Sequence, residues 1–88
     1  MRADKQKVGR LLKIARGQID GILKMIEHDA YCMDISNQLM ATASILRKAN
    51  REVVRAHMAG CLIEAAESGN ADEKLDELMA IIEKMEKG

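Results

Sequence analysis

Proline, tryptophan and phenylalanine are absent from the sequence, and tyrosine occurs once, so neither helix-breaking prolines nor an aromatic core is available. The chain is instead rich in Ala, Leu, Ile, Met, Lys and Glu, which favour helices. We therefore predict an all-α protein. Its 88 residues contain no linker, which predicts a single domain over residues 1–88, near the lower size limit for a self-sufficient core. Assembly into an oligomer would supply the missing core.

Long hydrophobic runs are also absent. No apolar run exceeds five residues, and the first seven residues, MRADKQK, carry four charges. Neither a signal peptide nor a membrane span fits this pattern, so we expect a cytoplasmic protein without a membrane partner. In that reducing compartment the two cysteines are not expected to form a structural disulfide. Packing, metal binding or reactive thiols remain as their roles.

The net charge is zero, but the charges are unevenly distributed. Residues 1–28 hold seven Lys/Arg against three Asp/Glu, or +4, whereas residues 63–88 hold three against eight, or −5. Such asymmetry indicates that the first helix faces an anionic partner such as nucleic acid. A solvated helix face is the alternative interpretation.

Apolar residues recur at three- and four-residue spacing in three segments, which predicts three amphipathic helices. The segments cover residues 8–26, 35–66 and 75–85. The stretch HDAYC at 28–32 interrupts the pattern, whereas Gly60 need not end the second helix. A middle helix of about 35 residues would be about 50 Å long, too long for its two neighbours to cover. An antiparallel helical dimer is therefore expected.

The stretch Ser68-Gly69-Asn70 predicts where the second helix ends. Gly69 suits the left-handed residue that follows a helix. Asn70 is then expected to cap the third helix, with Glu73 completing a capping box.

His57 and Cys61 are separated by one helical turn, while the other cysteine, Cys32, lies far upstream. At about 100° per residue, Cys32 falls within about 20° of both His57 and Cys61, so all three share one stripe of the middle helix. Along a continuous helix, however, Cys32 and Cys61 would be about 44 Å apart. One straight helix therefore cannot bring them together.

Two copies packed antiparallel across this stripe would bring Cys32 of one chain opposite His57 and Cys61 of the other. The two-fold axis would pass between Ile45 and Leu46, next to small residues that permit close helix approach. Each site would then offer two thiols and one imidazole, a soft ligand set that suits Cu(I). Structural Zn(II) usually takes four ligands. Simple core packing of the cysteines is the alternative, although a buried and unpaired His57 would be costly.

At these residues the sequence resembles the copper-sensing repressor family (CsoR-like), which also includes nickel or cobalt, formaldehyde and persulfide sensors. The resemblance covers nearly the whole chain and is carried by RGQIDGILKMIE at 16–27, AYCMDI at 30–35 and the spacing of Cys32, His57 and Cys61. It implies a four-helix-bundle dimer that assembles into a dimer-of-dimers homotetramer. Cu(I) would bind between protomers, to Cys32 of one and to His57 and Cys61 of its neighbour.

The resemblance also implies an outer layer of residues around the ligating histidine. In the family, a tyrosine and a glutamate form this layer, and Tyr31 and Glu77 stand at the matching positions. Glu77 would then orient the His57 ring. Without the resemblance, Glu77 would be taken for a solvated helix residue.

The kind of sensor within the family is indicated partly by residues that this sequence lacks. The first seven residues contain no histidine of the kind that nickel and cobalt sensors use, and Arg2 replaces the proline of formaldehyde sensors. Persulfide sensors usually lack the histidine. A persulfide or redox thiol sensor that uses Cys32 and Cys61 stays open as the alternative function, because the same geometry brings the two thiols together.

Six basic residues resemble the DNA-contacting surface of the family, although an ordinary charged face is an equal explanation for any single one: Arg10, Lys13, Arg16, Arg47, Lys48 and Arg51. Repeated over an oligomer, they could neutralise phosphates of operator double-stranded DNA. The predicted function is a transcriptional repressor whose metal-free form binds the operator and whose Cu(I) form binds it less tightly, which derepresses copper resistance genes. An enzyme with a small-molecule substrate is not expected. Such an enzyme would combine the Cys/His pair with an orienting acid and an oxyanion-binding loop, and the sequence shows no such combination.

Overall fold

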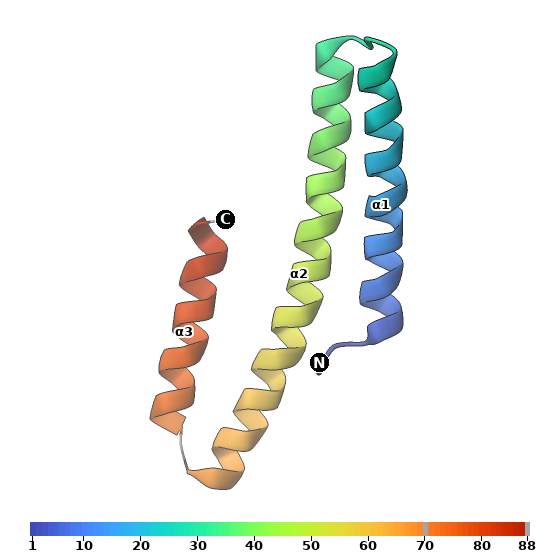
Figure 1. The fold of residues 1–88 in the computed structure, drawn as a ribbon. Coiled ribbons are helices and arrows are strands. Elements are labelled where there is room, and N and C mark those ends of the chain that lie inside the picture. The colour runs from blue at the N-terminus through green and yellow to red at the C-terminus, as the bar shows by residue number, and fades with distance from the viewer. Residues whose placement is uncertain (70, 88) are drawn as a thin grey trace. The chain divides into compact units, whose positions relative to one another are not determined.

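The computed structural model describes residues 1–69 and 71–87 and contains three helices, α1 (Lys5–Glu27), α2 (Cys32–Ser68) and α3 (Ala71–Lys87) (Figure 1). The described residues contain no strand, so the predicted all-α class and the long middle helix are confirmed. Gly60 lies within the 37 residues of α2. Among the described helices, none combines the length and the apolar character that crossing a membrane requires.

The described helices form two compact units. Residues 4–52 contain α1 and the first part of α2, and residues 1–3 together with 53–88 contain the rest of α2 and α3. We name them the hairpin unit and the C-terminal unit.

α1 begins at a capping residue that the sequence supplies. The carboxylate of Asp4 accepts hydrogen bonds from the backbone N–H groups of Gln6 at 2.9 Å and Lys7 at 3.2 Å. These bonds satisfy two of the N–H groups that have no partner within the helix. The start of α1 is therefore defined by one side chain.

The end of α1 is a Schellman turn built around an aspartate. Asp29 adopts a left-handed backbone conformation with φ 54°. Its N–H donates to the Ile26 carbonyl at 3.1 Å, and the Ala30 N–H donates to the Met25 carbonyl at 2.9 Å, which is the double bond of this motif. The chain then reverses, so that α1 and the first part of α2 run antiparallel, side by side (Figure 1).

The hairpin unit packs through residues at seven-residue spacing, which return to the same face of a helix. The buried set is Val8, Ala15 and Ile22 on α1, and Thr42 and Ala49 on α2. The Thr42 hydroxyl donates to Gln18 Oε1 at 2.7 Å, and Lys7 pairs with Glu52 at 3.1 Å. Because most of these residues are small, they allow close helix approach but bury little apolar area.

Larger apolar side chains of the hairpin unit remain exposed, in two further series with seven-residue spacing. They are between 44% and 54% exposed: Leu12, Ile19 and Ile26 on α1, and Leu39 and Leu46 on α2. A helix face of this kind normally packs against another element. The hairpin unit therefore has more apolar surface than its two helices cover.

The C-terminal unit begins its turn at the predicted glycine. α2 ends at Ser68, and Gly69 has φ 75° while its N–H donates to the Ala65 carbonyl at 3.0 Å. The predicted left-handed glycine is confirmed. The cap expected at Asn70 lies outside the described residues. The buried residues of this unit are Ala3, Cys61, Ala65 and Leu78.

Candidate metal site

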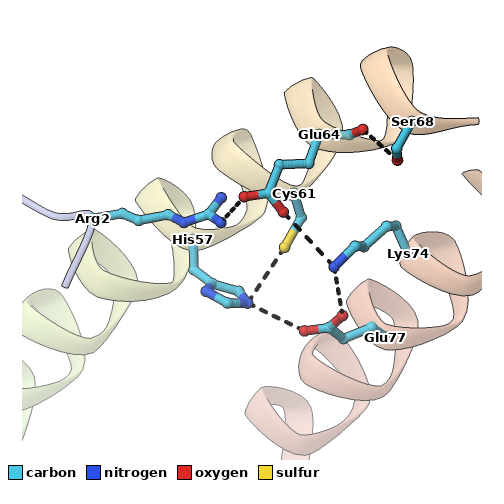
Figure 2. Close-up of polar contacts among 7 residues, drawn as sticks. All are labelled: Arg2, His57, Cys61, Glu64, Ser68, Lys74 and Glu77. Carbon is cyan, nitrogen blue, oxygen red and sulfur yellow. Dashed lines mark hydrogen bonds and ion pairs between the residues drawn. The ribbon is translucent and has the colours of Figure 1, made fainter. Parts of the chain in front are cut away.

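His57 and Cys61 lie on one face of α2, one turn apart, and their side chains point toward each other (Figure 2). His57 Nε2 is 3.4 Å from Cys61 Sγ. Cys61 is 1% exposed, whereas the His57 side chain is 42% exposed. Residues four apart on a helix are neighbours, so the sequence spacing itself produces this pair.

Glu77 of α3 completes a cluster with these two residues. Its Oε1 lies 3.3 Å from His57 Nε2, and one ligand atom from each of the three residues lies within 4.8 Å of the other two. Two helices of the C-terminal unit therefore bring a thiol, an imidazole and a carboxylate together.

The spacing of the His57 and Cys61 atoms suits a shared metal ion. Sulfur and nitrogen ligands at about 2.3 Å and about 2.0 Å from a metal, at a tetrahedral angle, lie about 3.5 Å apart. The observed Nε2 to Sγ distance is 3.4 Å. The thiol and the imidazole are thus close enough to share a soft or borderline metal ion, once the ring turns so that the nitrogen facing the thiol is not the one that donates to Glu77.

His57 Nε2 has two neighbours that make different demands on it. Glu77 can accept a hydrogen bond from this nitrogen when it carries a hydrogen, whereas a metal ion needs the nitrogen lone pair. A single nitrogen cannot do both, so the carboxylate and a metal would bind different nitrogens of the ring. Carboxylates are poor ligands for soft ions, which favours Glu77 as the hydrogen-bond acceptor that orients the ring.

A chain of ion pairs runs from Arg2 through Glu64 and Lys74 to Glu77 (Figure 2). Lys74 Nζ lies 3.8 Å from Glu77 Oε2 and also 3.8 Å from Glu64 Oε2. Glu64 in turn pairs with the guanidinium of Arg2. These four side chains place two cations and two anions next to the candidate ligands.

Cys32 and Tyr31 belong to the hairpin unit rather than to this cluster. Cys32 is exposed at the first position of α2, and Tyr31 is 68% exposed. The Tyr31 carbonyl accepts from the N–H groups of Asp34 at 3.0 Å and Ile35 at 3.2 Å, which starts the helix. Within the C-terminal unit the described cluster contains one thiol, so a second thiol would have to come from elsewhere.

Comparison with known proteins places the chain in a family. The family described as metal-sensitive transcriptional repressors matches residues 4–84, which include His57, Cys61, Glu77 and Cys32. The chain belongs to this family.

Curated relatives within the family are copper sensors by name. The copper-sensing transcriptional repressor CsoR of Mycobacterium ulcerans is 44% identical over 68 residues, which cover 77% of this chain and 58% of the relative. The CsoR of Bacillus subtilis is 30% identical over 84 residues, which cover 96% of this chain and 83% of the relative. For the Mycobacterium bovis CsoR, the match spans 65% of the relative's length. The chain thus spans about two thirds or less of the mycobacterial CsoR relatives.

Two solved structures share the fold. The nickel-responsive transcriptional regulator InrS superposes with a TM-score of 0.85 at 26% identity, covering 97% of this chain and 96% of the other. The copper-sensing repressor CsoR with Cu(I) from Geobacillus thermodenitrificans superposes with a TM-score of 0.79 at 31% identity, covering 91% of this chain and 83% of the other.

The basic residues expected in a repressor of this family lie in the hairpin unit. All six are exposed: Arg10, Lys13 and Arg16 on α1, and Arg47, Lys48 and Arg51 on α2. The ion pairs found within residues 1–69 and 71–87 involve none of them. Their charges are therefore available to an external anion.

Three residues of the metal cluster's surroundings were not found from the sequence: Arg2, Glu64 and Lys74. Lys74 and Glu77 are three apart on α3, a spacing that could have indicated a surface ion pair. Arg2 gives no such signal, because its partner Glu64 is 62 residues away.

Proposed function

We propose that the chain is a metal-responsive transcriptional repressor that binds operator DNA in its metal-free form and binds it less tightly with Cu(I). The observation that carries this proposal is the contact between His57 Nε2 and the buried Cys61 thiol at 3.4 Å, with Glu77 against the ring. The relatives named as copper sensors support copper as the metal.

Cu(I) would be held by His57 and Cys61 of one protomer and by Cys32 of the partner subunit. Two thiols and one imidazole form a soft ligand set, which favours Cu(I) over harder ions. When bound, the ion would join two protomers and so favour one arrangement of the pair. The thiol-sensing alternative is not favoured, because Cys61 is buried and already faces an imidazole.

The exposed apolar stripes of the hairpin unit support a dimer as the functional unit. Leu12, Ile19 and Ile26 on α1 and Leu39 and Leu46 on α2 would be covered by the same residues of a second copy, as in an antiparallel four-helix bundle. Leu46 adjoins the predicted two-fold axis. We further propose that two such dimers form the homotetramer of the repressor.

The six exposed cations of the hairpin unit would contact the phosphates of the operator. Their number predicts binding that weakens steeply as salt is added. Copper and DNA are then linked through the arrangement of protomers. By reciprocity, the DNA-bound repressor must bind copper more weakly than the free repressor, by the same factor.

Mixing two inactive variants tests whether the site is shared between chains. Cys32→Ala and Cys61→Ala should each abolish tight Cu(I) binding. A dimer that contains one chain of each kind has one intact site and one site without either thiol. Random exchange of subunits should therefore restore about a quarter of the sites, as two equivalent sites per symmetric dimer require.

Anaerobic Cu(I) titration against a competing chelator measures this recovery, and the unmixed variants are the controls. No recovery after verified subunit exchange would show that the two thiols do not share a copper ion.

Fluorescence anisotropy of labelled operator DNA tests the regulatory part. We expect Cu(I) to weaken DNA binding of the wild-type protein and to leave that of Cys61→Ala unchanged. Unchanged affinity of the wild-type protein with its copper sites saturated would contradict the proposed regulation.

A further inference from the structure

Arg2 lies across α2 next to the candidate metal site. Its guanidinium pairs with Glu64, and its neighbour Ala3 is 8% exposed (Figure 2). Residues 1–3 pack within the C-terminal unit although α1, which follows them, belongs to the hairpin unit. This N-terminal segment is therefore docked at the metal site rather than left in solvent.

Gly60 is what allows Arg2 to lie there. A Cβ atom added at Gly60 would overlap Arg2 Nη1 and would lie 2.7 Å from both Arg2 Cδ and Arg2 Cζ. Gly60 lies within α2, where a glycine is disfavoured relative to alanine. The absent side chain thus makes space for the arginine.

Within this chain of ion pairs, the two carboxylates are matched by two cations only when Arg2 is present. Lys74 lies 3.8 Å from a carboxylate oxygen of both Glu64 and Glu77, so a single ammonium group is shared by two anions. Arg2 supplies the second cation, and it pairs with Glu64. Without Arg2, Glu64 would compete with Glu77 for Lys74.

We propose that Arg2 is a positioning residue for the metal site: by neutralising Glu64 it leaves Lys74 to hold Glu77 against His57. Among the described residues, the ion pair of Arg2 is with Glu64, and Lys74 links Glu64 to Glu77, so Arg2 acts on the candidate ligands through other side chains. The inference rests on the proposed role of His57 as a ligand whose ring Glu77 orients. The N-terminal segment then becomes part of the site.

Two substitutions that break the same ion pair should have different effects on copper. Arg2→Gln leaves Glu64 charged, so Lys74 is drawn away from Glu77, and Cu(I) affinity should fall about threefold, less than the 10–100-fold typical of a residue that contacts a ligand directly. Glu64→Gln removes the competing carboxylate, so Lys74 should stay with Glu77 and affinity should stay within about twofold of wild type. The double variant Arg2→Gln/Glu64→Gln should regain wild-type affinity.

The same variants have a readout that needs no metal. In the metal-free protein, the 15N chemical shift of His57 Nε2 reports whether this nitrogen donates to the Glu77 carboxylate. It should change in Arg2→Gln and return to the wild-type value in the double variant. Lys5→Gln, an exposed position on α1 that is also near the N-terminus, is the control and should leave both the shift and the affinity unchanged.

Gly60→Ala provides an independent route to the same state. The added methyl group should displace Arg2 and give the Nε2 shift of Arg2→Gln while the helix content measured by circular dichroism is retained. If Arg2→Gln and Glu64→Gln weaken copper binding and move the His57 shift equally, Arg2 only anchors the segment and the proposal is overturned. If the shifts behave as expected but no variant binds Cu(I), the positioning role stands and the proposed copper function fails.

Discussion

The two units of the chain carry opposite charge and use their cations differently. The hairpin unit holds nine Lys/Arg against six Asp/Glu, or +3, and the C-terminal unit holds five against eight, or −3. The six candidate DNA-contacting residues of the hairpin unit have no ion pair among the described residues, whereas Arg2 and Lys74 are both paired with carboxylates. The cations proposed to contact DNA have no carboxylate partner among the described residues, whereas the cations beside the candidate metal site are paired with Glu64 and Glu77.

The two thiols show the same division. Cys32 of the hairpin unit is exposed, and Cys61 of the C-terminal unit is buried beside His57. The C-terminal unit thus holds a preformed candidate half-site, and the hairpin unit presents a single free thiol. A shared metal site built from such halves depends on how protomers are arranged.

The largest expected effect is the loss of either thiol. Cys32→Ala and Cys61→Ala should each weaken Cu(I) binding by about 100-fold or more, beyond what loss of an outer partner causes. Only Cys61→Ala should also destabilise the fold, by about 1 kcal/mol, because only Cys61 is buried. Chelator competition and urea denaturation measure the two effects. If Cys32→Ala binds Cu(I) as tightly as the wild-type protein, the hairpin unit contributes no ligand to the metal site.

Removing positive charge from the hairpin unit should weaken DNA binding and leave copper binding unchanged. The triple variant Arg47→Ala/Lys48→Ala/Arg51→Ala should lower the salt slope of operator binding by about 3 for each protomer that contacts the duplex, because each phosphate contact contributes about 0.9. Its Cu(I) affinity should equal that of wild type. Lys84→Ala, at an exposed lysine of the C-terminal unit, is the matched control for anisotropy titrations over a range of salt concentrations. An unchanged slope in the triple variant would show that these residues form an ordinary solvated face.

Glu77→Ala, in the C-terminal unit, should instead affect copper binding and leave DNA binding unchanged. Loss of the carboxylate proposed to orient His57 should weaken Cu(I) binding about tenfold and leave the DNA affinity of the metal-free protein unchanged. Glu73→Ala, an exposed glutamate one turn earlier on α3, should change neither. Equal copper affinities of the two variants in chelator competition would make Glu77 a solvated residue.

The smallest effect is expected from the hydrogen bond inside the hairpin unit. Thr42→Val removes the buried hydroxyl that donates to Gln18, which should lower the free energy of unfolding by about 1 kcal/mol. Ser44→Val, at an exposed position of the same helix, should cost less. Urea denaturation compares them. Equal losses would show that the Thr42 hydroxyl contributes nothing specific.

Local sequence patterns predicted the helices and one half of the candidate site. Apolar periodicity gave the order and approximate extent of α1, α2 and α3, and Gly69 gave the end of α2. The spacing of His57 and Cys61 placed their side chains together because helix geometry alone determines that contact. These features depend on residues within one turn of each other.

Features that depend on distant residues could not be derived in this way. The contact of Glu77 with His57 depends on how α3 packs, and it was predicted only through the family resemblance. The sequence shows that Gly60 is unfavourable within a helix. It does not show that the missing side chain leaves space for Arg2, which lies 58 residues earlier. Asp29 gave no signal either, because an aspartate rarely occupies the left-handed position where glycine is usual.

The Schellman turn at Asp29 has a mechanical consequence for the thiol that follows it. Since α1 stops at Glu27 and Cys32 is the first residue of α2, the direction in which that thiol points is set by the phase of α2 and not by α1. Each residue inserted into or deleted from α2 after Cys32 would turn the thiol by about 100° about the axis of α2 relative to the rest of that helix. The four-residue connection therefore separates the thiol from the rotation of α1, and α2 alone would set the angle at which one protomer of the proposed dimer offers its sulfur to another.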